Sequence, residues 1–282
     1  MNPNITALLD EAVSRLKRTG AENPVFDAEA IFSEVLNVPR LELRIFCDRE
    51  MLPAEIEKIS ELLARRESGE PLQYIFGAAH FRKLTLHVAP GVLIPRPETE
   101  MLVDLALESI PERASICDIG TGSGAIALSL AYERPDSRVF AVDISQAALS
   151  LAGKNQAVLH LENVAFVCGD LLDSFKKERC FDLIAANLPY VTSLEYESLP
   201  REVRDHEPEN ALRAGDDGLD VIARLIQCAP DYMREGGRLI IEFGPGQTER
   251  IRELFDAAGR YKMPELVKDL SGRDRFFTVR IW

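Results

Sequence analysis

Strand-like and helix-like segments alternate along the C-terminal two-thirds of the chain. Short apolar runs rich in Ile, Val and Phe (SICDIG, RVFAVDI, VAFVCGD, FDLIAAN and GRLIIEFG) are separated by segments of helical periodicity, among them GAIALSLAYE and LDVIARLIQCAPDYMRE. Strands and helices that alternate in this way form a mainly parallel sheet with helices on both faces. The sequence therefore predicts a doubly wound α/β domain. The C-terminal LVKDLSGRDRFFTVRIW adds an expected antiparallel hairpin at the sheet edge.

Residues 1–73 show a different periodicity, with apolar residues recurring every three or four positions. Pro24 and Pro53 stand where helices commonly begin. We expect a small helical domain here, and we expect this domain to bind a partner. The helical segments are residues 5–20, 24–38 and 53–69.

Residues 74–94 alternate more nearly in twos and are broken at Gly77 and at Pro90-Gly91, which predicts a β-hairpin linker. Residues 95–282 then form the larger domain, which opens with a helix at Pro97.

Composition excludes several classes of protein. The 282 residues are 46% hydrophobic and carry a net charge of -13, which disfavours a protein that tracks nucleic-acid phosphates. Five cysteines without a CxxC pair indicate neither a disulfide framework nor a metal site. No apolar run has the length of a membrane helix, and the N-terminus lacks the apolar core of a secretion signal. We expect a soluble, cytoplasmic protein with no membrane partner and no stable nucleic-acid partner.

A glycine-rich loop follows the first strand of the larger domain and leads directly into a helix. Glycines let the backbone turn sharply there and let a ligand lie against the main chain at a helix N-terminus. The GxGxG spacing predicts a nucleotide-like ligand but differs from the GxGxxG spacing of pyrophosphate-binding loops. The loop consists of Gly120, Thr121, Gly122, Ser123 and Gly124.

Two carboxylates accompany this loop. Asp143 ends the second strand 19 residues after Gly124, close to the roughly 20 residues at which an acid reaches a ribose hydroxyl pair. The competing interpretation of Asp143 is a turn residue or helix N-cap before SQAAL. Asp118, on the first strand, is expected to anchor the amino end of a cationic ligand, directly or through water.

Both NAD and S-adenosylmethionine fit these features. The sulfonium cofactor carries no phosphate and does not need the third glycine of the pyrophosphate motif. At the end of the third strand, Asp170 offers an acceptor for an adenine amino group, and Leu171 can cover the ring face. Either residue can equally be a simple strand end.

The fourth strand ends in Asn187-Leu188-Pro189-Tyr190. Ligands of open α/β sheets bind beyond the carboxyl ends of the strands, so Asn187 is expected to face the cofactor. Two acceptors, Asn187 Oδ1 and the Leu188 carbonyl, can hold a planar NH2 group so that its nitrogen points at a sulfonium methyl. Pro189 stiffens the turn and Tyr190 supplies an aromatic wall. The alternative is an ordinary strand-ending turn.

The chain resembles the glutamine methyltransferases that modify peptide chain release factors. The resemblance covers nearly the whole length and rests on blocks in the family's order. These blocks are GEPLQYIFG, LIPRPETE, DIGTGSGAIALSLA, AVDIS, FDLIAANLPY, EP with GDDGLD at residues 207–220, and LIIEFGPGQ.

The resemblance implies an N-terminal helical domain that docks the release factor, a hairpin linker, and a Rossmann-like methyltransferase domain with a mostly parallel seven-stranded sheet. It implies methyl transfer from S-adenosylmethionine, with S-adenosylhomocysteine as product, to the glutamine amide nitrogen of a Gly-Gly-Gln loop. The loop Gly120 to Gly124, Asp143 and Leu171 would line the cofactor, and Asn187 to Tyr190 would hold the glutamine.

This chain departs from the family's Asn-Pro-Pro-Tyr in having Leu188 at the first proline. Leucine keeps the carbonyl through which that position is expected to act. Asn-Leu-Pro-Tyr also occurs in ribosomal RNA adenine dimethyltransferases, so an N6-adenine methyltransferase acting on DNA or RNA is the alternative enzyme. A binding module without turnover is the non-enzymatic alternative.

Overall fold

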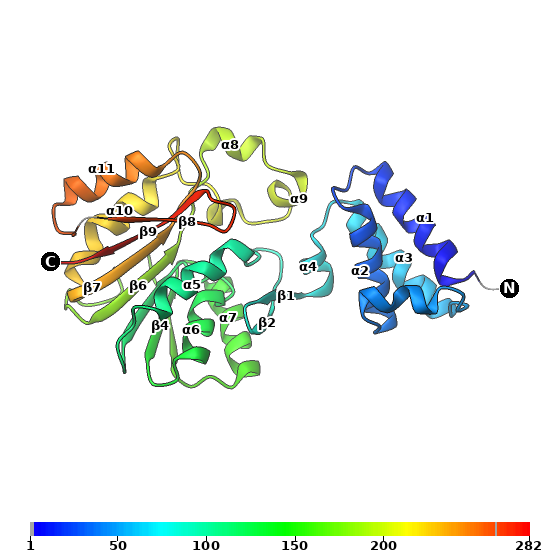
Figure 1. The fold of residues 1–282 in the computed structure, drawn as a ribbon, viewed down its shortest axis with the longest axis horizontal. Coiled ribbons are helices and arrows are strands. Elements are labelled where there is room, and N and C mark those ends of the chain that lie inside the picture. The colour runs from blue at the N-terminus through cyan, green and yellow to red at the C-terminus, as the bar shows by residue number, and fades with distance from the viewer. Residues whose placement is uncertain (1–2, 263) are drawn as a thin grey trace. The chain divides into compact units, whose positions relative to one another are not determined.

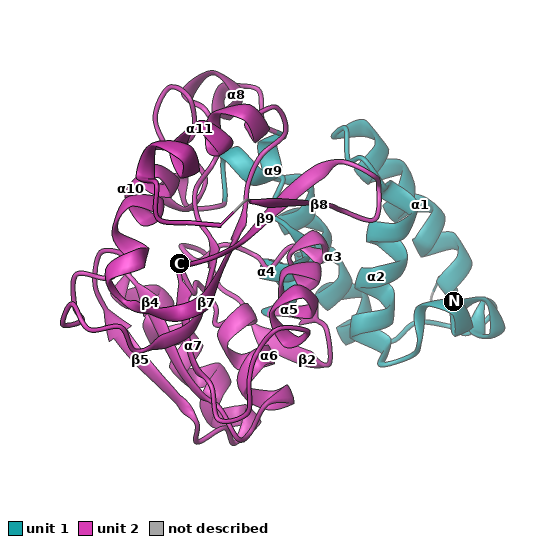
Figure 2. Ribbon diagram, turned by 60° about the vertical axis from the view of Figure 1, so that its left-hand side comes forward, with its two compact units in different colours: residues 1–77, 200–206 teal, residues 78–199, 207–282 magenta. Residues whose placement is uncertain are grey.

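The computed structural model describes residues 3–262 and 264–282, and the chain forms two compact units. The first unit comprises Met1–Gly77 and Pro200–His206, and the second comprises Ala78–Leu199 and Glu207–Trp282. Figure 1 labels the elements and Figure 2 colours the two units separately.

The first unit is helical, and local signals explain where its helices begin. The side chain of Asn4 caps the first helix by accepting a hydrogen bond from Ala7 N at 3.0 Å. Pro24 and Pro53 occupy the first positions of the next two α-helices, where a missing N–H costs nothing. The elements are α1 (Ile5–Arg18), α2 (Pro24–Leu36), η1 (Arg40–Phe46), α3 (Pro53–Glu67), α4 (Leu72–Phe76) and α9 (Arg201–Arg204).

An ion cluster centred on the buried Arg66 ties α9 into this unit. Arg66 of α3 donates from Nε to Asp27 Oδ2 at 2.8 Å and pairs through Nη1 with Glu202 Oε2 at 2.7 Å. Arg66 and Asp27 are both buried. The segment 200–206 therefore packs with helices that precede it by well over a hundred positions.

The second unit is built on a seven-stranded sheet with strand order β5-β4-β3-β6-β7-β9-β8. The first five strands of this order are parallel, and β9 runs antiparallel to both β7 and β8. This confirms the predicted mostly parallel sheet with a C-terminal hairpin. The strands are β3 (Ser115–Ile119), β4 (Arg138–Asp143), β5 (Val164–Cys168), β6 (Phe181–Asn187), β7 (Met233–Glu242), β8 (Glu265–Lys268) and β9 (Asp274–Arg280).

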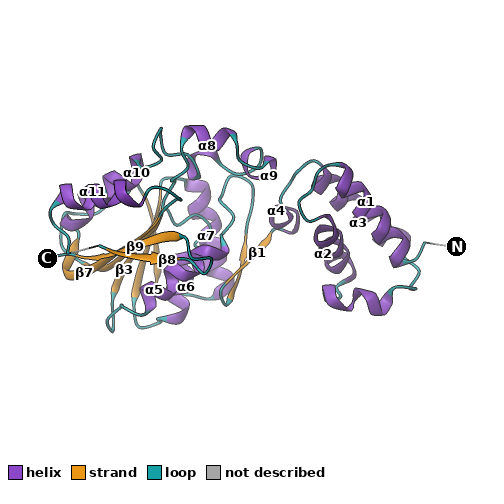
Figure 3. Cartoon of the chain, turned by 45° about the horizontal axis from the view of Figure 1, so that its top comes forward, coloured by secondary structure: helices purple, strands orange, loops and turns teal. Residues whose placement is uncertain are grey.

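Helices cover both faces of the sheet (Figure 3). On one face, α10 (Asp220–Cys228) and α11 (Thr248–Ala258) pack on Ile119, Ile184 and their neighbours. On the other, α5 (Glu100–Leu107) and α6 (Ala125–Glu133) pack on Ile116, Leu183 and Ile240. The remaining helical segments of this unit are η2 (Pro97–Thr99), α7 (Gln146–Leu159), α8 (Ser193–Glu197), η3 (Glu209–Ala211) and η4 (Ala229–Asp231).

The strand order reverses between β3 and β6. The chain runs from β3 outward to β4 and β5, then returns to pair β6 on the other side of β3. The loops that follow β3 and β6 therefore diverge at one point, which is where open α/β sheets bind their ligands.

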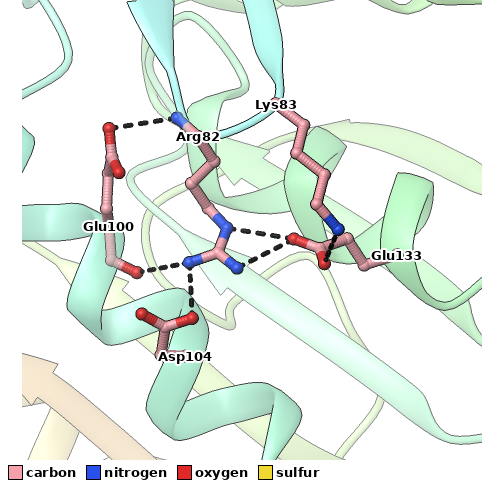
Figure 4. Close-up of polar contacts among 5 residues, drawn as sticks. All are labelled: Arg82, Lys83, Glu100, Asp104 and Glu133. Atoms are coloured by element: carbon pink, nitrogen blue, oxygen red, sulfur yellow. Dashed lines mark hydrogen bonds and ion pairs between the residues drawn. The ribbon is translucent and has the colours of Figure 1, made fainter.

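A two-stranded hairpin, β1 (Ala78–Phe81) with β2 (Leu84–His87), begins this unit. Its turn residue Arg82 donates to Asp104 Oδ1 at 2.7 Å and to Glu133 Oε1 at 2.9 Å, and its backbone N–H donates to Glu100 Oε1 at 3.0 Å (Figure 4). Lys83 also pairs with Glu133. These contacts fasten the hairpin to α5 and α6.

Two predicted elements differ from the structure. Residues 74–76 lie in α4 rather than in the predicted hairpin, because the αL conformation of Gly77 (φ 70°) ends a short helix before β1 begins. The helix predicted over residues 219–235 ends at Cys228, and Met233 to Glu235 already belong to β7. No helix of the described ranges combines the length and apolar character needed to cross a bilayer.

Candidate active site

The glycine loop between β3 and α6 turns through three left-handed residues, Gly120 (φ 75°), Gly122 (φ 57°) and Gly124 (φ 88°). A Cβ on Gly120 would lie 3.1 Å from Leu188 Cδ2 and 3.4 Å from the Asn187 carbonyl oxygen. Glycine is therefore required there both for its φ and for the close approach of the loop to the end of β6.

Four of the five N–H groups of this loop are used within the protein. Gly120 N and Thr121 N donate to the Val142 carbonyl at 2.9 Å, and Gly124 N donates to the Thr121 carbonyl at 2.8 Å. Gly122 N donates to Asp143 Oδ2 at 2.8 Å. A pyrophosphate would need such donors for itself, so the loop is not arranged as a phosphate cradle.

Asp143 lies at the end of β4 and lines the cavity described below. Its second oxygen accepts from Ser145 N at 2.8 Å, while the Ser145 side chain caps α7. Burial raises the pKa of the Asp143 carboxyl group. Each carboxylate oxygen has a further lone pair, so Asp143 can also accept hydrogen bonds from a ligand.

Asp118 lies near the end of β3, under the glycine loop. Its carboxyl group is fully buried beneath the loop, where Oδ2 accepts from Thr121 Oγ1 at 2.7 Å and from Ala127 N at 3.1 Å. Burial raises the pKa of this group to about 7. Asp118 thus satisfies an N–H in the first turn of α6 and supports the loop from below, and it does not line the cavity.

Asp170 and Leu171 follow β5 and both line the cavity. Asp170 Oδ2 pairs with Arg224 Nη2 of α10 at 2.7 Å, and Arg224 lines the same cavity. Leu171 is buried and adopts a left-handed φ of 52°, which is unusual for leucine and presents its side chain to the cavity wall. The role of Arg224 was not predicted.

Asn187 ends β6 with a half-buried carboxamide. Its Nδ2 donates to Thr99 Oγ1 at 2.9 Å, which leaves Oδ1 as the amide atom that Thr99 does not use. Leu188 is buried against the glycine loop, and Asn187, Leu188 and Pro189 all line the cavity.

Tyr190 packs behind this turn, outside the cavity lining. The Tyr190 carbonyl accepts a hydrogen bond from Gln247 Nε2 at 2.9 Å, and a Cβ on Gly244 would meet the Tyr190 ring at 2.9 Å. Gln247 Oε1 in turn accepts from Gly244 N at 2.9 Å. The loop after β7 therefore fixes the backbone of the Asn187 to Tyr190 turn.

A cavity of about 330 Å³ lies at the point where the strand order reverses. This volume is in the range of roughly 300–1,000 Å³ that is typical of small-molecule sites. Of the predicted residues, those on its wall are Gly120, Thr121, Gly122, Ser123, Asp143, Asp170, Leu171, Asn187, Leu188 and Pro189, whereas Asp118, Gly124 and Tyr190 lie behind it.

Two further sets of contacts hold the cavity wall, and neither can be predicted from a sequence pattern. Asn155 of α7 accepts from His87 N at 2.7 Å and donates to the Ser123 carbonyl at 2.9 Å, joining the hairpin to the glycine loop. Glu207 accepts from Arg96 Nη2 at 2.6 Å, and Arg96 faces the cavity. Both partners of each pair are far apart in the chain, so no local pattern reveals them.

Within residues 3–262 and 264–282, no group of three or more His, Cys, Asp or Glu side chains is placed to hold a metal ion.

Comparison with known proteins agrees with this architecture. Residues 7–77 match the family described as PrmC N-terminal domain, and residues 111–256 match the family described as Methyltransferase domain. A methyltransferase structure from Pyrococcus furiosus shares the fold with a TM-score of 0.53 at 18% identity, over 79% of this chain and 98% of that one.

Two full-length relatives are proteins named release factor glutamine methyltransferase. The one from Nitratidesulfovibrio vulgaris is 41% identical over 99% of this chain and 98% of its own length. The one from Moorella thermoacetica is 40% identical over 95% of both chains. The chain therefore belongs to the release factor glutamine methyltransferase family.

Proposed function

We propose that this protein transfers a methyl group from S-adenosylmethionine to the side-chain amide nitrogen of the glutamine in the Gly-Gly-Gln motif of peptide chain release factors. The observation that carries the proposal is the carboxamide of Asn187 on the cavity wall, with Nδ2 bound to Thr99 and Oδ1 left for a ligand. An amide oxygen in that place can accept a hydrogen bond from the NH2 group of a substrate.

The cavity suits a nucleoside without phosphate. Four of the five loop N–H groups, which a pyrophosphate would need as donors, already have protein acceptors, and this favours S-adenosylmethionine over NAD. We assign Asp143 to the ribose hydroxyls, Asp170 to the adenine amino group, and Leu171 with the Gly120 to Gly124 loop to the cofactor's faces. When bound, the cofactor supplies a methyl group activated by a sulfonium sulfur.

The protein's own task is to prepare the nitrogen. The lone pair of an amide nitrogen is delocalised, so the NH2 group must be held firmly for that nitrogen to react. Asn187 Oδ1 and the Leu188 carbonyl accept one hydrogen bond each from the NH2 group. Both oxygens are neutral and do not take up a proton, so the proton that the nitrogen loses on methylation passes to solvent. Fixing this geometry is worth several kcal/mol of the barrier by analogy with other positioning effects.

The substrate class follows from the family. Relatives of full length are named for release factor glutamine methylation, and we extend that substrate to this chain. We assign release factor docking to the helical unit, in keeping with its match to the PrmC N-terminal domain. A release factor acts at the ribosome, so the reaction is placed in the cytoplasm.

The test is a labelling assay with S-adenosylmethionine carrying a radioactive methyl group. We expect label in a release factor, and none in the same factor with its motif glutamine replaced by alanine. Label on adenine of RNA or DNA, with none on the release factor, would overturn the proposal in favour of the adenine methyltransferase alternative.

A further inference from the structure

A chain of two hydrogen bonds leads from Asn187 into the protein interior. Asn187 Nδ2 donates to Thr99 Oγ1 at 2.9 Å, and Thr99 Oγ1 donates to Glu242 Oε2 at 2.8 Å. Thr99 closes η2 and Glu242 closes β7, where it is the register partner of Asn187 in the parallel β6–β7 pair. Thr99 is 4% exposed and Glu242 is 1% exposed, so water does not compete for these bonds.

The chemistry of the three side chains fixes the direction of both hydrogen bonds. An ionised carboxylate only accepts hydrogen bonds, so the single hydroxyl proton of Thr99 must go to Glu242. Thr99 Oγ1 can then serve Asn187 only as an acceptor. The Asn187 carboxamide must turn its NH2 group toward Thr99, and its oxygen is left for the cavity.

Without such a partner, the carboxamide has little reason to prefer one orientation. Its two ends are similar in size, and the terminal torsion of asparagine has a broad, nearly two-fold profile. An amide turned by half a rotation would present a donor to the donor NH2 group of a substrate. The orientation of Asn187 therefore decides whether the site attracts or repels that group.

We infer that Thr99 and Glu242 are positioning residues that fix the carboxamide of Asn187 with Oδ1 toward the substrate amide. This inference rests on the proposed function and gives a role to the PET segment of LIPRPETE and to the glutamate of LIIEFG.

Protonation of Glu242 would remove the constraint. A neutral carboxyl group can donate to Thr99, which can then donate to Asn187 Oδ1 and reverse the chain. Burial raises the pKa of Glu242 to about 7, so this reversal falls within an accessible pH range. The charged and titratable groups that face Glu242 are Arg275 of β9, Arg96 just before η2, Glu98 within η2, and Tyr190 after β6.

The kinetic test uses the full-length protein with Thr99→Val, Thr99→Ser and Glu242→Gln. We expect Thr99→Val to lower kcat/KM for the release factor about tenfold or more, which is the scale of one lost hydrogen bond in a site. Thr99→Ser keeps the hydroxyl and should stay near wild type. The wild-type rate should fall as pH drops through about 7, and Glu242→Gln should lose this dependence.

Two exposed positions provide matched controls. Thr85→Val in β2 and Glu265→Gln in β8 make the same chemical changes at exposed positions and should leave the rate and its pH dependence unchanged. The inference would be overturned by a Thr99→Val enzyme with wild-type kcat/KM. It would also be overturned if the rate of Glu242→Gln fell toward acid pH as steeply as that of the wild type. In either case the proposed function would still hold if the wild-type enzyme transferred the radioactive methyl group to the release factor.

A second measurement needs no turnover. The side-chain NH2 signals of Asn187 in an NMR spectrum, assigned by their loss in Asn187→Ala, should shift with a single titration near pH 7. That titration should vanish in Glu242→Gln and persist in Thr99→Ser. Asn187 signals that do not titrate in the wild type would overturn the inference even if no release factor were methylated.

Discussion

At the scale of single residues, the neutrality of Asn187 matters most. A carboxylate in its place would offer Thr99 a second acceptor, and the single Thr99 proton already goes to Glu242. An amide alone can both donate to Thr99 and accept from a substrate NH2 group. This explains why a polar, uncharged side chain ends a buried strand.

Replacing Asn187 by alanine tests that role. We expect kcat for release factor methylation to fall at least about 100-fold, because one of the two acceptors that hold the substrate amide is lost. Binding of S-adenosylmethionine, measured by calorimetry, should change little. Asn187→Asp should be similarly inactive, and a variant of either kind with wild-type turnover would refute the acceptor role.

Asp118 offers a prediction about pH and stability. Its folded-state pKa of about 7 lies above the ordinary 3.8, so the stability it contributes is full below the ordinary value and is lost as pH rises through 7. The free energy of unfolding of the wild type should therefore fall as the pH rises from about 5 to about 8. In Asp118→Asn the fall should be smaller by a few kcal/mol.

Urea unfolding at the two pH values measures this difference. The exposed Asp10→Asn of α1 is the control and should follow the wild type. Parallel pH dependence of Asp118→Asn and the wild type would contradict the burial argument.

The residues that belong to local motifs can be predicted from the sequence, whereas those that act through long-range contacts cannot. Asn187, Asp143 and the glycine loop stand at strand ends, where the fold alone directs side chains to the ligand. The partner of Asn187, Thr99, lies 88 positions away, and Glu242 lies 143 positions from Thr99. Asp118 was predicted to anchor the ligand and lies behind the cavity wall, because a strand pattern does not tell whether an acid at a strand end lies under the next loop or in front of it.

At the scale of elements, the glycine loop is held against the end of β6 by two features of Gly120. We expect Gly120→Ala to lower the free energy of unfolding by about 1–2 kcal/mol, because alanine is strained at a φ of 75° and its Cβ would press on Leu188. The same push should displace the Leu188 carbonyl and reduce methyl transfer.

Gly153 in α7 is the matched control. A Cβ there meets no atom within 4 Å, and Gly153 lies inside a helix, where alanine is favoured over glycine by about 0.5–1 kcal/mol. Gly153→Ala should raise Tm, whereas Gly120→Ala lowers it. Two glycine variants with the same effect on Tm would contradict the close-approach argument.

The periodicity of apolar residues predicts an element well where the whole segment forms a single helix or a single strand. The predicted strand over residues 115–120 is β3, and the predicted helix over 248–259 is α11, each within one residue. The boundary between α10 and β7 was missed, because apolar spacing continues through Tyr232 and Met233 although the α-helix stops at Cys228 and a 3-10 turn containing Pro230 follows.

At the scale of the whole molecule, the buried Arg66 cluster holds a distant segment in the helical unit. Arg66→Met should lower the free energy of unfolding by about 3–5 kcal/mol, because it leaves the carboxylate of Asp27 buried without its cation. Denaturant unfolding measures the loss, and Arg44→Met at an exposed position is the control.

A second change separates charge from packing. Adding Asp27→Leu to Arg66→Met removes the unpaired carboxylate and should restore part of the lost stability. A double variant that is less stable than Arg66→Met alone would show that the cluster stabilises the unit in another way.

The most direct measurement is a crystal structure of the protein with S-adenosylhomocysteine and a peptide containing Gly-Gly-Gln. We expect the glutamine nitrogen within hydrogen-bonding distance of both Asn187 Oδ1 and the Leu188 carbonyl, facing the sulfur of the product. A glutamine side chain that approaches the sulfur without contacting Asn187, or an Asn187 oxygen turned toward Thr99, would contradict the proposed mechanism.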